Sequence, residues 1–284
     1  MITRTRATLL TLGVVALAGV VGASCSPAAE AQKTTAASGA RQDITALTPG
    51  KGVKIKFSDK PVKLPDFKIQ DINGKTISPA DWTGKVVLIN FWATWCGPCR
   101  SEIPELIAFQ KHYGDQLVIV GLSVDEGSPE DVKKFVAENG MNYTVAIADM
   151  ALQKQFGGVT AVPATFVVNP EGGIVQRHVG LLRPDVTEHE IRSLAHLETP
   201  AEIELVPDTG QVLIANAAYA TEIPGVDLTS VTSKQKEAIL KRLNTDKCTC
   251  GCDRTLAQCR IEDPTCQTSL PAAKKVAAGI VGGK

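Results

Sequence analysis

Two cysteines separated by two residues are the side chains in this sequence best suited to chemistry. Cys96 and Cys99 lie in the stretch FWATWCGPCR, residues 91–100. A cysteine at the start of a helix ionises more readily than usual, because free amide groups and the helix dipole favour negative charge there. The spacing alone suits three kinds of site: a structural disulfide, half of a metal site, or a redox pair in which one sulfur attacks a disulfide and the other completes the exchange.

A second group of cysteines lies in the stretch CTCGCDRTLAQCRIEDPTC near the end of the chain. Cys248, Cys250 and Cys252 occupy alternate positions that suit a tight loop, and a helical turn over TLAQC would return Cys259 to the same point. Four thiolates make a tetrahedral Zn²⁺ or Cu(I) site chemically reasonable. The alternative is two disulfides, with one of these four or Cys266 left over, and the sequence leaves both interpretations open.

The first residues have the plan of a secretory signal. Two arginines precede an apolar run over residues 9–21, and small residues follow it. We therefore expect residues 1–24 to be a signal peptide and the mature chain to leave the cytoplasm, where disulfides can persist. Cys25, in VGASC, resembles the lipidated cysteine of a bacterial lipoprotein cleavage box; cleavage at AEA, residues 29–31, is the alternative and would remove it.

The charge balance of the chain argues against one class of partner. The 284 residues include 30 basic and 30 acidic side chains, so the formal net charge is zero. Such a chain has no overall attraction to a polyanion, and we expect no nucleic-acid partner.

Alternating strand and helix patterns begin after residue 50. Residues 25–50 are small and polar without a hydrophobic period, which predicts a flexible tether. The strands that we predict from apolar runs cover residues 53–57, 86–92, 117–124, 143–147, 164–169 and 174–180. The helices that we predict cover residues 98–113, 128–139, 184–197 and 233–244. This order predicts an α/β fold, a mixed sheet with helices on both faces.

Several motifs together resemble the thioredoxin superfamily. WCGPC follows the apolar run VVLINFWAT, and VPATFVV comes about sixty residues later. More narrowly, GKVVLINFWATWCGPCRSEIPEL and VIVGLSVDE are similar to the exported, membrane-tethered thiol-disulfide oxidoreductases of the TlpA and ResA kind. The resemblance covers about residues 60–196, so we expect a thioredoxin-like domain over residues 51–197. Scattered prolines predict a linker over residues 198–232, and a small Cys-rich helical module follows over residues 233–284.

The resemblance implies roles for particular residues. Cys96 matches the family's exposed nucleophile, and Cys99 matches its resolving cysteine. Trp95 matches a side chain that covers the disulfide and helps to form the docking surface for substrate. Val162 and Pro163 match a peptide bond that is cis in this family, where the backbone of the residue before the proline pairs with the substrate chain.

One departure from cytoplasmic thioredoxins concerns proton transfer. Those proteins carry a buried aspartate at the position of Asn90, and an amide cannot accept the proton of Cys99. Glu102, three residues after Cys99, matches a carboxylate of the exported relatives. We expect Glu102 to tune the thiol pKa values and to assist proton transfer. The alternative is a first-turn glutamate stabilised by the helix dipole.

The resemblance implies an exported enzyme, on the periplasmic or outer face of the cytoplasmic membrane, that acts on protein thiols and disulfides. The Gly-Pro pair between the cysteines resembles strongly reducing members, so we expect a reductant. The family implies roles in cytochrome c maturation or in the assembly of oxidase copper sites. No cofactor is required for the exchange itself, but a membrane protein must donate electrons, because the sequence lacks a nicotinamide or flavin fingerprint.

Two other classes of function stay open at this point. A peroxiredoxin-like peroxidase shares much of the fold. A metal-delivery protein would use the C-terminal cysteines as its working site.

Overall fold

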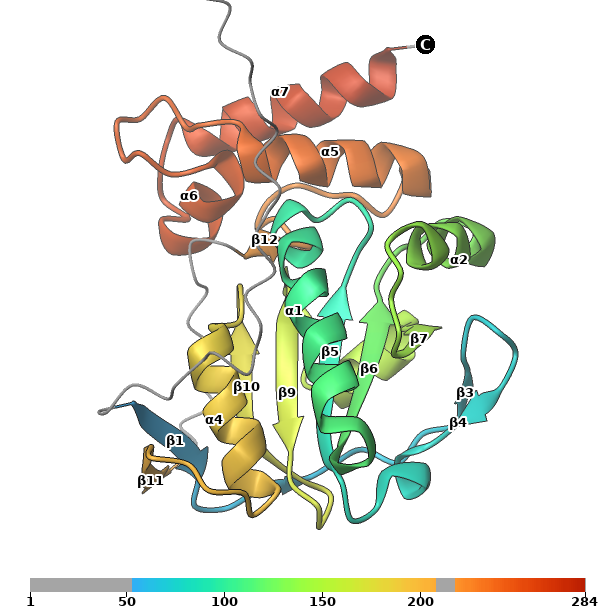
Figure 1. Cartoon of the computed structure of the whole chain (residues 1–284). Helices are drawn as coiled ribbons and strands as arrows, with labels where there is room; N and C mark the ends of the chain where they lie inside the picture. The colour runs from blue at the N-terminus through green and yellow to red at the C-terminus, as the bar shows by residue number, and fades with distance from the viewer. Residues whose placement is uncertain (1–52, 208–217, 284) are drawn as a thin grey trace, which may run out of the picture. The chain divides into compact units, whose positions relative to one another are not determined.

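The computed structural model of the chain describes residues 53–207 and 218–283, all within one compact unit (Figure 1). The predicted signal peptide, the predicted tether and Cys25 lie outside the described residues. Across the described ranges, no helix combines the length and the apolar character needed to span a bilayer.

A six-stranded mixed sheet forms the centre of the fold, in the order β2-β10-β9-β5-β6-β7. Its strands are β2 (Val62–Lys63), β5 (Val86–Trp92), β6 (Leu117–Ser123), β7 (Thr144–Ile147), β9 (Ala164–Val168) and β10 (Gly173–Val179). Strands β5, β6 and β7 run parallel, whereas β9 is antiparallel to both β5 and β10. Every residue of the central strand β5 is buried, which explains its unbroken apolar sequence. All five sheet strands predicted from residue 86 onward are confirmed.

Helices α1 (Gly97–Tyr113) and α4 (Pro184–Leu194) lie together on one face of the sheet (Figure 1). The hydroxyl of Tyr113 donates to Glu188 Oε1 over 3.0 Å and joins the two helices. Helix α2 (Pro129–Glu138) begins after Ser128, whose hydroxyl accepts from the amide of Glu130. A short helix, α3 (Met150–Gln155), was not predicted, because six residues are too few to show a helical period.

Aromatic side chains fill the opposite face of the sheet. The ring of Phe91 packs against those of Phe156 and Phe166, with centroids 5.1 and 5.8 Å apart. Phe67 contacts both Phe156 and Trp82, and Trp82 ends the 3-10 turn η2 (Pro79–Trp82). Helices on one face and this aromatic layer on the other bury the sheet on both sides.

Smaller strand pairs surround the sheet. A turn that contains Asn73 and Gly74 joins β3 (Ile69–Gln70) to β4 (Thr76–Ile77). β1 (Lys54–Ser58), the predicted first strand, pairs in parallel with β11 (Glu202–Val206). β12 (Tyr219–Ala220) pairs with β8 (Ala161–Val162). Both β11 and β12 come from the stretch predicted as a linker. Parts of that stretch therefore pair with strands of the predicted thioredoxin-like domain.

Three helices follow, and they pack around a core of their own. They are α5 (Ser233–Thr245), α6 (Leu256–Glu262) and α7 (Ser269–Gly282). Their shared core includes Ile239, Leu243, Ala257, Cys259 and Ala273. The fold class is therefore confirmed as a thioredoxin-like mixed sheet flanked by helices with a Cys-rich helical region after it, whereas the exact domain boundaries stay a prediction.

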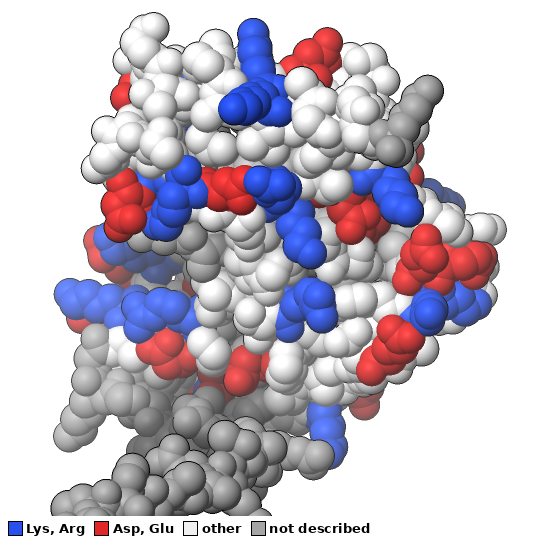
Figure 2. All heavy atoms as spheres, turned by 90° about the horizontal axis from the view of Figure 1, so that it is seen from above, with Lys and Arg blue, Asp and Glu red and all other residues white. Residues whose placement is uncertain are grey.

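The surface carries charges of both signs. On the face shown in Figure 2, Lys and Arg side chains lie among Asp and Glu side chains rather than in a field of their own. This mixture agrees with the zero formal charge of the sequence.

The aromatic layer generates a stability prediction. We expect Phe91→Ala to lower the free energy of unfolding by about 3–5 kcal/mol, because it leaves a cavity beside Phe156 and Phe166. Leu205→Ala is the control: Leu205 is 66% exposed, so the change should stay within about 0.5 kcal/mol. Urea denaturation of both variants checks this. Similar losses for the two variants would contradict the assigned core.

Candidate active site

The first turn of α1 carries the redox pair. Cys96 is the N-terminal capping residue of the helix, and its sulfur accepts a hydrogen bond from the amide of Cys99 over 3.2 Å. The two sulfurs form a disulfide, with the Cα atoms 5.3 Å apart. Pro98 lies in this first turn, where no intrahelical amide hydrogen bond is lost. The predicted location of the pair at a helix N-terminus is thus what the structure shows.

The peptide bond between Val162 and Pro163 is cis and lies beside the pair. Cys96 Sγ is 3.7 Å from the carbonyl oxygen of Val162, although 66 positions separate the two residues in the chain. Trp95 is partly buried and packs against both hydrophobic cores, that of the sheet and that of helices α5 to α7. The structure therefore brings Trp95, Cys96, Cys99, Val162 and Pro163 together, as the sequence motifs predict.

Exposure of the pair differs from the expectation. The resemblance implies an exposed nucleophile, but Cys96 is 0% exposed and Cys99 is 1% exposed. Strand β12 lies against the same site, because Tyr219 pairs with Val162. A Cβ atom added to Gly97 would stand 3.3 Å from the Tyr219 hydroxyl oxygen. The chain's own strand occupies the backbone edge that was expected to receive substrate.

Glu102 lies in the second turn of α1, and its carboxyl group is buried at 4% exposure. Asn90 Nδ2 donates to Glu102 Oε1 over 2.7 Å and to Thr165 Oγ1 over 3.0 Å, and the amide of Leu182 donates to Glu102 Oε2 over 3.2 Å. No acidic residue occupies the first turn of the helix, so the first-turn alternative does not describe Glu102. Asn90 and Glu102, noted separately in the sequence, form one polar cluster.

Burial makes the carboxyl group of Glu102 a weaker acid than an exposed glutamate. Desolvation raises the pKa of its carboxyl group to about 7, against the opposing effects of the Leu182 amide, the Asn90 amide and the charge of His178. A carboxyl group with this pKa gains and loses a proton near neutral pH, as a general acid or base must.

The C-terminal cysteines lie in a separate group. Cys248, Cys250, Cys252 and Cys259 have their sulfurs within 4.8 Å of one another, and Cys266 is not part of this group. All five are free thiols in the structure. The predicted helical turn, now α6, does return Cys259 to the loop that carries the other three.

Sequence reasoning missed Tyr219 and Thr165, whose hydroxyl accepts from Asn90. Tyr219 bears on the site through tertiary contacts alone, and the predicted linker held no pattern that marked it. Thr165 stands in the VPATFVV motif, and the strand pairing of Asn90 with Thr165 would have revealed it.

Known proteins match this part of the chain in sequence. The model of the AhpC/TSA family matches residues 62–177. The thiol-disulfide oxidoreductase ResA of Bacillus subtilis is 37% identical over 139 residues, which are 49% of this chain and 75% of that protein. This chain belongs to the ResA-like thiol-disulfide oxidoreductases of the thioredoxin superfamily. It is an enzyme of thiol-disulfide exchange, and its relatives imply protein thiols as substrates.

Two further matches are also named as thiol:disulfide interchange proteins. The thiol:disulfide interchange protein HelX of Rhodobacter capsulatus is 40% identical over 112 residues, covering 39% of this chain and 61% of HelX. A solved thiol:disulfide interchange protein of the thioredoxin family from Chlorobium tepidum is 30% identical, with a TM-score of 0.45 over 49% of this chain and 99% of that one.

The buried carboxyl group generates a prediction about stability and pH. Because folding raises the pKa of Glu102 from 4.5 to about 7, its contribution to stability is complete below pH 4.5 and is lost as pH rises through 7. At 1.36 kcal/mol per pKa unit, we expect the stability of wild type to fall by about 3 kcal/mol relative to Glu102→Gln between pH 4 and 8.

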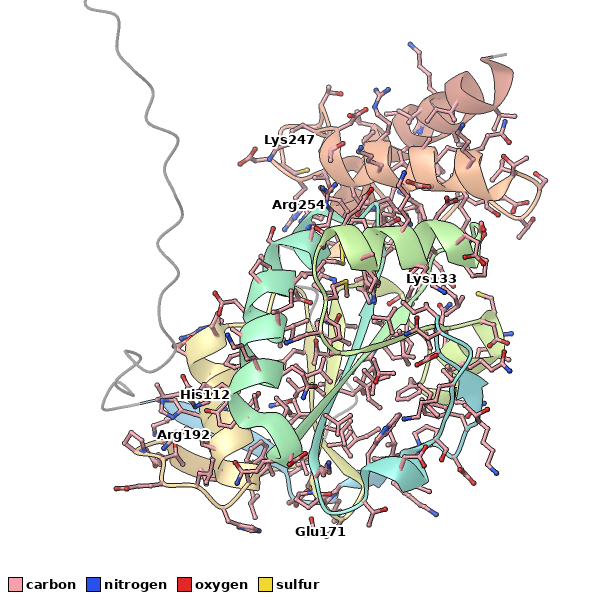
Figure 3. The ribbon with its side chains drawn as sticks, turned by 45° about the vertical axis from the view of Figure 1, so that its right-hand side comes forward. His112, Lys133, Glu171, Arg192, Lys247 and Arg254 are labelled. Carbon is pink, nitrogen blue, oxygen red and sulfur yellow. A yellow bond between two sulfur atoms is a disulfide. The ribbon has the colours of Figure 1, made fainter. Side chains whose placement is uncertain are left out.

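Glu171→Gln is the control, since Glu171 lies exposed in the turn between β9 and β10 (Figure 3). Urea denaturation across this pH range should show the wild-type slope for Glu171→Gln and a flatter profile for Glu102→Gln. Parallel profiles for all three proteins would contradict the assigned pKa.

Proposed function

We propose that this enzyme reduces disulfides of other proteins outside the cytoplasm, with Cys96 as the attacking sulfur and Cys99 as the resolving one. The observation that carries the proposal is the position of the Cys96–Cys99 disulfide, at the N-terminus of α1 and 3.7 Å from the Val162 carbonyl. Reactive sulfurs and a backbone edge for a substrate chain thereby share one site.

The exchange proceeds in two steps from the reduced pair. The Cys96 thiolate attacks one sulfur of the substrate disulfide, a mixed disulfide forms, and the other substrate sulfur leaves as a thiolate. The Cys99 thiolate then attacks Cys96 Sγ, which forms the internal disulfide and releases the second substrate thiolate. Two electrons pass from the enzyme to the substrate.

The local structure supports this division of roles. The capping position gives the Cys96 sulfur a hydrogen bond from the Cys99 amide, and the helix N-terminus favours a negative charge at the same point. Cys99 lies in the first turn of α1 directly after this capping position, so its sulfur is placed to attack Cys96 Sγ once a mixed disulfide has formed there.

Glu102 is the proposed proton acceptor for Cys99. Its pKa of about 7 lets it take up a proton near neutral pH, and Asn90 and the Leu182 amide hold its carboxyl group in place. The proton of Cys99 leaves as the second step begins, and Glu102 returns it to solvent or to the departing thiolate.

The direction and the physiological role extend the proposal. Gly97 and Pro98 between the cysteines favour a low reduction potential, near the roughly −270 mV of thioredoxin. The substrates that we propose are disulfides, formed either by the apocytochrome c cysteines before haem attachment or by the copper-site cysteines of oxidase assembly proteins. A membrane protein would return electrons to the pair, and lipidation at Cys25 would hold the enzyme on the periplasmic or outer face of the membrane.

Trapping of substrates tests the roles of the two cysteines. Cys99→Ala should accumulate mixed disulfides through Cys96, because the second step has no nucleophile, whereas Cys96→Ser should lose essentially all exchange with protein disulfides. Cys266→Ser, a change at a free cysteine outside the pair, should retain wild-type activity. Insulin reduction and non-reducing gels with mass spectrometry measure these outcomes.

The same preparations separate this function from a peroxidase. We expect consumption of hydrogen peroxide to be far slower than reduction of insulin. A wild-type enzyme that consumes peroxide rapidly and leaves protein disulfides intact, or a Cys99→Ala variant that traps nothing, would overturn the proposal.

A further inference from the structure

We propose that Cys248, Cys250, Cys252 and Cys259 bind a single thiophilic metal ion, Zn²⁺ or Cu(I). The Cys250 sulfur lies 3.3 Å from that of Cys248, 3.0 Å from that of Cys252 and 3.9 Å from that of Cys259. A Zn–S bond of about 2.3 Å places the sulfurs of a tetrahedral site roughly 3.8 Å apart. These four cysteines are free thiols, whereas Cys96 and Cys99 form a disulfide. All four sulfurs lie within 4.8 Å of one another, and the two shorter pairs need to open by less than about 1 Å to reach the tetrahedral spacing.

Backbone hydrogen bonds fix the loop that carries Cys248, Cys250 and Cys252. Lys247 and Thr255 form an antiparallel bridge, and the amide of Cys248 donates to the carbonyl of Arg254 over 2.8 Å, so the ends of the loop are closed. Gly251 turns the loop at a φ of 89°, in the region that favours glycine. The side chain of Thr255 then caps α6, which delivers Cys259 to the three loop cysteines.

The burial of these cysteines also suits a metal site. Cys248 and Cys259 belong to the core shared by α5, α6 and α7, whereas Cys250 is exposed and leaves the ion a route of entry. The cationic side chains of Lys247 and Arg254 lie on the same loop (Figure 3), and each is paired with a carboxylate, that of Asp253 and that of Glu262. An ion here would tie the loop to α6 and stabilise a region whose own core is small.

Metal analysis of the full-length protein, purified with a reductant and without chelator, tests the site. We expect one Zn²⁺ or one Cu(I) per chain by elemental analysis and native mass spectrometry, and the elemental composition distinguishes the two ions. Addition of Co²⁺ to the metal-free protein should produce thiolate-to-cobalt charge-transfer absorption. Cys259→Ser should lose the bound ion and this spectrum, and Cys266→Ser should keep both. Fully reduced protein that binds neither ion, or purified protein with two disulfides among these four cysteines, would overturn the proposal.

A second proposal rests on different contacts and on the proposed function. We infer that β12 acts as a built-in competitor of substrate, which must leave the Val162 edge before a protein disulfide can reach Cys96. Tyr219 pairs with Val162 and Ala220 with Ala161, in the antiparallel manner of an added substrate strand. Beyond them, Thr221 donates its amide to Thr160 O over 2.9 Å and its hydroxyl to Val159 O over 2.7 Å.

The C-terminal helices hold this strand in place. Asn244 of α5 accepts from the amide of Ala220 over 2.7 Å and donates to its carbonyl over 2.9 Å, so one side chain satisfies both backbone groups. An ion pair between Lys236 of α5 and Glu126 adds a second link to the N-terminal half. The strand is therefore clamped between the two halves, and weakening the clamp should uncover the dithiol.

This inference is tested by comparing two rates in the full-length reduced enzyme: the rate of insulin reduction and the rate of reaction with a small aromatic disulfide. We expect Asn244→Ala to reduce insulin about tenfold faster than wild type and to react with a small aromatic disulfide at a rate that rises less. Thr221→Val, which loses only the hydrogen bond to Val159, should show the same direction with a smaller effect. Asn139→Ala is the matched control, because that amide caps α2 and has no contact with β12. Thermal unfolding of each variant checks that the fold is retained.

The outcomes separate this inference from the function on which it rests. Equal insulin rates for wild type and both folded variants would overturn the competitor role and leave the oxidoreductase function intact. Failure of every protein to reduce insulin, while the small disulfide still reacts with Cys96, would overturn the proposed action on protein disulfides.

Discussion

The register between strands β5 and β9 is the constraint on which the active site depends. Asn90 pairs with Thr165 and Phe91 pairs with Ala164, so the end of β5 and the start of β9 meet at one point. The cysteine turn continues from β5, and the cis peptide bond precedes β9, so this register places Cys96 against Val162. A slip by one residue would turn the side chains of either strand to the opposite face and separate the groups. Because every residue of both strands is buried, such a slip would also move the polar side chains of Asn90 and Thr165 into the aromatic layer.

The same pairing creates the proton chemistry. Asn90 and Thr165 face the helix side of the sheet, and Asn90 reaches Glu102 on α1. A carboxyl group in this position loses its contact with water, and three opposing interactions only partly offset that loss. The buried, ionised carboxylate of Glu102 lowers the stability of the fold above neutral pH, and the same burial gives the carboxyl group a pKa suited to proton transfer. The site thus holds a destabilising group where exchange requires a proton acceptor.

The C-terminal helices alter what the shared thioredoxin-like core presents to its surroundings. Their strand β12 lies on the edge next to the dithiol, and Trp95 packs against both halves. Four cysteines of the same helical region gather within the span of one metal ion. The packing of the C-terminal helices against one another governs how firmly β12 covers Cys96. Metal binding and access to the redox pair are therefore expected to be coupled.

The sequence by itself determined five of the six sheet strands, the helices α1, α2, α4 and α5, and the dithiol at a helix start. These follow from local patterns, because a buried strand is a continuous apolar run and a capped helix has its own signature. Motifs also marked Val162, Pro163 and Glu102 as candidates. Only the tertiary structure decided that Cys96 is covered, that Asn90 and Glu102 are hydrogen-bonded, and that four thiols converge. Each of these depends on contacts between residues far apart in the chain, such as Tyr219 on Val162, and burial by a distant segment leaves no periodic pattern at either position.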